Sequence, residues 1–145
     1  MKKTFTKDVE IALKKIQSHI RKTPLQYSPI LSKQTGTETY IKLENFQITG
    51  SFKARGATNK LIILSEENPK RIITASSGNH GSAVAYAAAK LNLDVLIFLP
   101  KIVSSAKLKK IKSYGAEVKI SGHDSGDAEL AAKNFAEANN YPYLS

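Results

Sequence analysis

The amino-acid sequence predicts an α/β fold, an open and mostly parallel sheet with helices on both faces. From Tyr40 onward, short apolar runs alternate with segments of helical periodicity. This alternation is typical of parallel strands joined by right-handed helical crossovers. The run Val95–Leu99 is continuously apolar, as expected for a strand covered on both faces. The 145 residues are enough for one domain with a hydrophobic core.

The first part of the chain predicts a helix, a loop with a short helix, and a strand. Four apolar side chains recur at helical spacing: Val9, Leu13, Ile16 and Ile20. This spacing predicts a helix over residues 6–20. Thr23 then ends the helix, because the residue before a proline is disfavoured in helical conformation. A loop with a short helix is expected over residues 25–36, and a strand over residues 40–44.

The rest of the chain predicts helices and strands in alternation. In chain order they are a helix from about residue 51, a strand at 72–73, a helix through 83–91, a strand at 95–99, a helix over 104–115, a strand at 118–120, a helix through 128–135 and an apolar run at 141–144. Ser104 is a suitable helix cap and Gly115 a suitable helix stop. Because the chain ends just after its last apolar run begins, we expect the sequence to be truncated.

Composition narrows the possible functions. There is no cysteine, which excludes disulfides, thiolate metal sites and cysteine nucleophiles. The formal charge is +10, but no aromatic residues alternate with the lysines as a base-stacking surface requires, so nucleic-acid binding is not expected. No residues have metal-ligand spacing. The longest apolar run is too short to span a bilayer, so we expect a cytoplasmic protein without a membrane segment.

Lys53 lies where a strand pattern gives way to a helix pattern, in the run from Lys42 to Ala57. Burial at such a turn favours the neutral form of a lysine amine, which can form a Schiff base with a carbonyl cofactor. Gly50 permits close approach of the backbone to a ligand, and Phe52 is positioned to lie near a cofactor ring. The alternative is an ordinary exposed lysine at the start of a helix.

A second turn, residues 75–81, follows the next apolar run and opens the next helix. It reads Ala-Ser-Ser-Gly-Asn-His-Gly. Unpaired N–H groups at a helix N-terminus bind carboxylates or phosphates, and the Asn79 amide can bond a phenolic oxygen. The alternative is simple capping by Ser77 or Asn79. Ligands of open α/β sheets bind at the carboxyl ends of strands, where we expect both turns to lie.

Together these segments resemble the N-terminal part of the fold-type II pyridoxal-phosphate enzymes, specifically the serine/threonine dehydratase and serine racemase group. The resemblance rests on four runs: residues 23–25, 42–57, 74–81 and 115–118. It implies that residues 1–50 form an N-terminal segment belonging to the family's large domain. Residues 51–145 would then form the α/β small domain.

The resemblance also implies roles for single residues. Lys53 would hold pyridoxal 5'-phosphate as a covalent aldimine and remove the substrate's α-proton, with Phe52 against the cofactor ring. Asn79 would bond the phenolic oxygen. The substrate carboxylate would be held by the loop that comprises Ser76, Ser77, Gly78, Asn79 and His80. Ser77 matches the acid/base serine of the racemases, whereas many threonine dehydratases have alanine there. Arg55 is expected to be structural.

The implied reaction is the deamination of L-threonine or L-serine to a 2-oxo acid and ammonia, by a homo-oligomer acting on a small amino acid. The family's glycine-rich phosphate loop lies downstream of these residues. We therefore expect the chain alone to bind the cofactor weakly and to have little turnover. Three alternatives stay open: a serine racemase activity, a non-catalytic α/β remnant and, least favoured, a basic nucleic-acid-binding module.

Overall fold

A parallel sheet forms the centre of the molecule in the computed structural model, which describes residues 2–145 and the side chains from residue 5 onward. Its strands β3 (Ile72–Ala75), β4 (Val95–Leu99) and β5 (Glu117–Ile120) lie side by side in that order. Tyr143 pairs in parallel with Ile73, so the last residues of the chain extend the sheet beside β3. The predicted mostly parallel sheet is confirmed.

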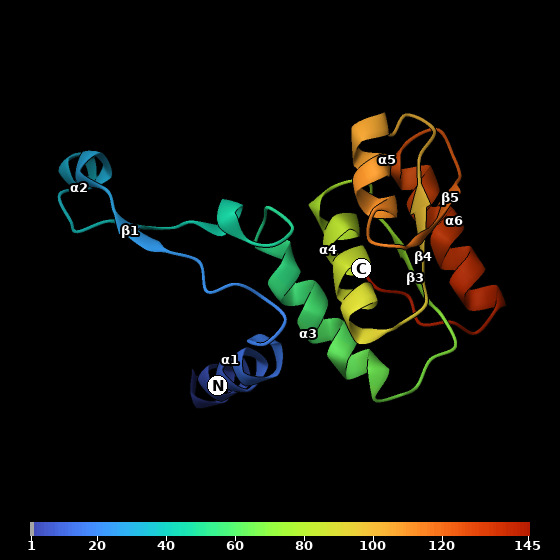
Figure 1. The fold of residues 1–145 in the computed structure, drawn as a ribbon, viewed down its shortest axis with the longest axis horizontal. Coiled ribbons are helices and arrows are strands. Elements are labelled where there is room, and N and C mark those ends of the chain that lie inside the picture. Colours follow the sequence, from blue (N-terminus) through green and yellow to red (C-terminus); the bar gives the residue numbers. More distant parts are fainter. Residues whose placement is uncertain (1) are drawn as a thin grey trace.

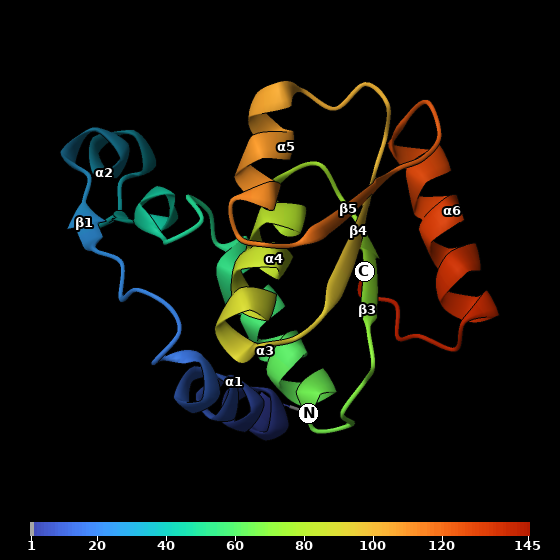
Figure 2. The ribbon, with the colours of Figure 1, turned by 45° about the vertical axis from the view of Figure 1, so that its right-hand side comes forward.

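Helices cover both faces of this sheet (Figures 1 and 2). On one face lie α3 (Lys53–Ser65), α4 (Asn79–Leu91) and α5 (Ser105–Lys112). The other face carries α6 (Ser125–Ala138). The strands supply alternate residues to the two cores, as the period of two in a strand requires.

The two cores can be followed along β4. Ile97 packs towards α3, α4 and α5, whereas its neighbours Leu96 and Phe98 pack towards α6. All three side chains are buried. On the first face, α4 presents a run of fully buried alanines, whose small side chains allow α3 to pack closely against it. This close packing sets the start of α3 beside the start of α4.

The residues before α3 form a more open unit, in which the first helix lies beside α3 and the rest extends away from the parallel sheet (Figures 1 and 2). It comprises α1 (Lys2–Ile16), β1 (Leu25–Tyr27), α2 (Pro29–Thr35), β2 (Tyr40–Lys42) and the short 3-10 helix η1 (Glu44–Phe46). Strands β1 and β2 pair antiparallel in a sheet of their own, and all their residues are exposed. The short helix predicted within residues 25–36 is confirmed as α2.

Two predictions for this first unit are wrong. The first helix spans residues 2–16 instead of 6–20, because tertiary hydrogen bonds occupy the backbone beyond it. The Tyr86 hydroxyl donates to the His19 carbonyl at 2.7 Å, and the Gln47 side chain bonds both the N–H and the carbonyl of Arg21. Residues 25–27 are a strand instead of a loop, because β2 supplies a pairing partner.

None of the helices in the described part of the chain has the length and apolar character that crossing a bilayer requires.

Candidate active site

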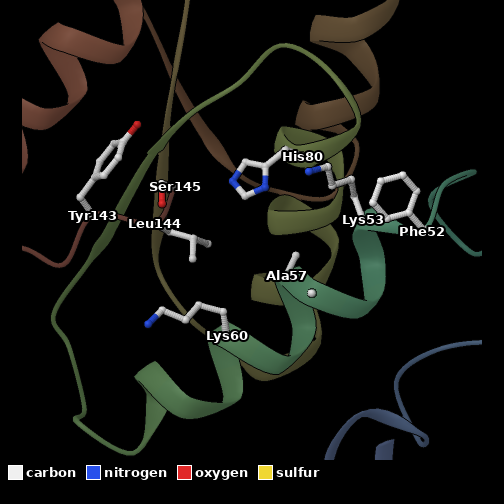
Figure 3. A pocket seen from close by; sticks show the side chains of 9 residues that line it. Phe52, Lys53, Ala57, Lys60, His80, Tyr143, Leu144 and Ser145 are labelled. Carbon is white, nitrogen blue, oxygen red and sulfur yellow. The ribbon is translucent and has the colours of Figure 1, made fainter. Parts of the chain in front are cut away.

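Lys53 and His80 lie in the same cleft, which has a volume of about 490 Å³ (Figure 3). Lys53 is the first residue of α3, and His80 is the second residue of α4. The amine of Lys53 points towards the imidazole of His80. The lining residues are Phe52, Lys53, Gly56, Ala57, Lys60, His80, Tyr143, Leu144 and Ser145. The packing of α3 against α4 therefore brings together residues from both turns that the sequence singles out.

The turn before Lys53 is fixed by several hydrogen bonds. The Gly50 N–H donates to the Gln47 carbonyl at 2.8 Å, and Gly50 has a φ of 77°, which favours glycine. The ammonium of Lys110 on α5 donates to the Thr49 carbonyl at 2.9 Å. This turn follows η1 and the small antiparallel sheet. The prediction that it follows a strand of the same parallel sheet as the second turn is therefore wrong.

The side chain of Lys53 is exposed. Its ammonium lies 5.4 Å from the centre of the Phe52 ring, which is itself 61% exposed. The expected burial of this lysine is therefore wrong for the chain as it stands, because no described residue covers the start of α3. An exposed amine beside an open cleft is accessible to a carbonyl compound from solution.

The loop before α4 leaves the start of that helix without a side-chain cap. The N-cap residue is Gly78, which has no side chain to accept a hydrogen bond. By contrast, Ser104 caps α5 and Asp124 caps α6 through side-chain oxygens. Capping by Ser77 or Asn79 is therefore not observed. The first N–H groups of α4 stay available to an anion, which the positive end of the helix dipole also favours.

His80 is held between β3 and the end of the chain. Its Nε2 lies 3.2 Å from the hydroxyl oxygen of Thr74, and that hydroxyl donates to the Leu144 carbonyl at 2.6 Å. Burial lowers the pKa of His80 below its ordinary value of 6.5, and the positive charge of Lys53 lowers this pKa further. A hydrogen bond with the Leu144 backbone opposes the decrease. The imidazole is therefore neutral at pH 7.

The remaining residues of the loop face a different hollow. Ser76, Ser77 and Gly78 line a space of about 280 Å³ against the start of α6, which contributes Ser125 and Glu129. Asn79 is exposed. Of the candidate site residues, the cleft thus contains Phe52, Lys53 and His80. The three loop residues before Asn79 line the hollow beside α6 instead.

The cleft also contains residues that sequence reasoning missed. Lys60 could have been found, because it lies seven positions after Lys53 and therefore on the same face of a helix. Tyr143 and Leu144 could not, because only the parallel pairing of Tyr143 with Ile73 places them there. From the sequence, Thr74 is indistinguishable from an ordinary buried strand residue. Its contact with His80 depends on the conformation of the loop between β3 and α4.

Arg55 is the third residue of α3. It binds Glu44 and does not line the cleft. Its guanidinium donates to both carboxylate oxygens, at 2.9 and 2.7 Å, and the Thr23 hydroxyl donates to the same carboxylate at 2.5 Å. The hydrogen bond from Arg55 is the main cause that holds the pKa of Glu44 below its usual value. These contacts agree with a structural role for Arg55.

Within residues 2–145, no three histidine, aspartate or glutamate side chains gather closely enough to hold a metal ion.

Comparison with known proteins places this fold in a class. The chain shares its fold with the serine racemase of Dictyostelium discoideum, at 37% identity and a TM-score of 0.84 over 95% of this chain and 45% of that one. A threonine deaminase of T.th. matches at 37% identity and a TM-score of 0.81, over 95% and 44% of the two chains. Over the matched part of their chains, both proteins share the fold of this chain.

The family follows from the sequence comparison. A family model described as pyridoxal-phosphate dependent enzyme matches residues 16–145. The chain is also 40% identical over 131 residues to the L-threonine ammonia-lyase of Thermotoga maritima, covering 90% of this chain and 33% of that relative. The chain belongs to the pyridoxal-phosphate dependent enzyme family. It spans only about a third of the length of that curated relative.

Proposed function

We propose that this chain supplies the lysine-bearing part of a pyridoxal-phosphate enzyme that deaminates L-threonine or L-serine to a 2-oxo acid and ammonia. The observation that carries this proposal is the cleft in which the exposed amine of Lys53 faces a neutral His80. The threonine ammonia-lyase and threonine deaminase among its relatives support the reaction class.

The residues present fit the cofactor. The cleft volume of about 490 Å³ lies within the range of small-molecule sites. Lys53 offers an accessible amine to an aldehyde, and we assign it as the residue that carries the cofactor covalently. Phe52 supplies an exposed ring next to that amine, and Asn79 supplies an exposed amide for a phenolic oxygen. When bound, the cofactor supplies an electron sink for the charge left at the substrate's α-carbon.

The protein groups would then act as follows. The uncapped start of α4, with the side chains of Ser76, Ser77, Asn79 and His80, would bind the substrate carboxylate. The amine of Lys53 would take the α-proton once the substrate occupies the site. Loss of the β-hydroxyl and hydrolysis would release ammonia and the 2-oxo acid.

The test is to add pyridoxal phosphate to the chain and to record the absorbance spectrum. Because the chain offers no glycine-rich phosphate loop, we expect a weak and easily dialysed absorbance band and negligible 2-oxobutanoate from threonine. The band should be absent in Lys53→Ala and retained in Lys60→Ala, which removes the other lysine of the same cleft. A band that persists in Lys53→Ala would contradict the assignment of this lysine. Rapid turnover by the chain alone would contradict the expected weak binding.

A serine racemase activity is the second candidate, favoured by the hydroxyl at Ser77 and by the structural match to a serine racemase. Racemisation needs an acid/base group on the face of the α-carbon opposite Lys53. Ser77 lines a different hollow from Lys53, which is compatible with such an approach. In the whole protein, D-serine formation from L-serine that disappears in Ser77→Ala, with pyruvate formation retained, would establish it. Formation of pyruvate without D-serine would exclude the racemase activity and support only the dehydratase activity.

For the whole protein we further propose a cytoplasmic homo-oligomer acting on a small amino acid. Residues 1–50 are proposed to belong to the family's large domain and residues 51–145 to its small domain. Every residue of β1 and β2 is exposed, so these strands are not part of the core of the α/β unit. This exposure supports the proposed division. Limited proteolysis of the chain tests it, with cleavage before residue 51 expected to precede cleavage within the α/β unit.

A further inference from the structure

Thr74 is a buried polar residue that no proposed step uses. It is the third residue of β3 and is fully buried, at 0% exposure. Its hydroxyl oxygen lies 2.6 Å from the Leu144 carbonyl oxygen and 3.2 Å from Nε2 of His80. It therefore connects the end of the chain to the imidazole that faces Lys53.

The number of protons decides the direction of these bonds. A hydroxyl carries one proton, and a carbonyl oxygen can only accept. The short contact to Leu144 therefore uses the Thr74 proton. For the contact with His80 to be a hydrogen bond, Nε2 must carry the proton and donate to Thr74. In the neutral ring, Nδ1 then holds an unshared electron pair.

The surroundings favour the neutral form of His80, and Lys53 is the cation that lies beside its ring. Lys53 and Lys60, both on α3, line the same cleft, as does Tyr143 from the end of the chain. None of the described side chains that line the cleft is acidic. In Figure 3 the amine of Lys53 lies on one side of the imidazole, and Leu144 lies on the other. The side that faces Lys53 is thus opposite the side held by Thr74 and Leu144.

We propose that Thr74 is a positioning residue that holds His80 in its Nε2–H form, so that Nδ1 accepts a proton from the Lys53 ammonium. The step breaks one Nζ–H bond and forms one Nδ1–H bond. The positive charge moves from the lysine to the imidazole, and the open cleft allows the imidazolium to release the proton to water. This inference rests on the proposed function, because it gives Lys53 the neutral amine that reaction with a carbonyl requires.

Nitrogen NMR of the chain without cofactor tests the tautomer directly. The chain has three histidines, and comparison with His80→Gln assigns the signals of His80. At neutral pH we expect His80 in the Nε2–H form. Thr74→Ser keeps the hydroxyl and should keep this form, whereas Thr74→Val should give a mixture of tautomers. A wild-type Nδ1–H form would overturn the proposal even if the valine variant failed to fold. So would a folded Thr74→Val that keeps the wild-type tautomer.

The proton acceptor role is tested by the rate at which pyridoxal phosphate modifies Lys53, measured after borohydride reduction by peptide mass spectrometry. Near neutral pH we expect Thr74→Val to slow labelling of Lys53 on the order of tenfold, since a positioned base typically contributes at least this much. Labelling of Lys60 should not change, and Thr74→Ser should restore the rate at Lys53. An unchanged rate at Lys53 in Thr74→Val would overturn the role. By contrast, no labelling of wild-type Lys53 would refute the proposed function and leave the NMR result standing.

Discussion

At the level of single residues, the ion pair between Arg55 and Glu44 links the open N-terminal unit to the helix that carries Lys53. Both side chains are partly buried, at 29% and 16% exposure, and the guanidinium binds the carboxylate with two hydrogen bonds. Charge-assisted pairs of this geometry are among the strongest that side chains form. This pair is therefore one of the contacts that hold the first unit against the α/β unit, beside those of Lys15 with Glu66 and of His19 with Tyr86.

Glu44→Gln should lower the free energy of unfolding by about 1–3 kcal/mol, because it leaves Arg55 without its charged partner. The matched control is Glu66→Gln, which removes the exposed pair with Lys15 and should cost less than about 1 kcal/mol. Urea unfolding of both variants measures the difference. Equal effects of the two substitutions would show that the Glu44 pair has no special structural role.

The lowered pKa of His80 also predicts a pH dependence of stability. Between this lowered pKa and the ordinary value of 6.5, the unfolded chain binds more protons than the folded chain. The free energy of unfolding should therefore rise with pH across this window and decrease under acid conditions. Urea unfolding from about pH 5 to pH 8 should show a smaller rise in His80→Gln, which cannot titrate. Parallel curves for wild type and variant would contradict the prediction.

At the level of elements, the turn from β5 into α6 requires a glycine. Gly122 has a φ of 73°, and an added Cβ would collide with Asp127 in the first turn of α6. Gly36 has a similar φ of 71° but open space around it. The two positions therefore separate backbone strain from steric collision.

Gly36→Ala should destabilise the chain by about 1–2 kcal/mol, which is the usual cost of the left-handed conformation. Gly122→Ala should cost roughly 1–3 kcal/mol more, because α6 must also shift. Thermal unfolding of the two variants provides the comparison. A Gly122→Ala variant as stable as Gly36→Ala would show that α6 moves aside at no cost.

The elements that could be predicted from the sequence are those with a clear pattern in their own residues. The strand at Val95–Leu99 is predicted to the residue, because its apolar run is continuous. The cap of α5 at Ser104 is confirmed for a similar reason. By contrast, β1 carries no local strand signal, and its existence depends on pairing with β2. The end of the first helix depends on the bonds that Tyr86 and Gln47 make with the following backbone.

At the level of the whole molecule, the parallel sheet explains why distant segments meet at the cleft. Close packing of α3 on α4 places Lys53 beside His80, although they are separated by β3 in the sequence. The sequence predicts that both turns lie at one site, but the turn before Lys53 follows η1 instead of a strand of the parallel sheet, so α/β topology alone does not account for their approach. The positions of Leu144 and Ser77 could not be predicted, because they depend on the pairing beside β3 and on the packing of α6.

The most direct test of the central claim asks which lysine pyridoxal phosphate modifies. The chain is incubated with the cofactor and reduced with borohydride, and its peptides are analysed by mass spectrometry. We predict that Lys53 is modified in clear preference to every other lysine, including Lys60 in the same cleft. Modification spread evenly over the lysines, or concentrated at Lys60, would contradict the assignment of Lys53 as the cofactor-carrying residue.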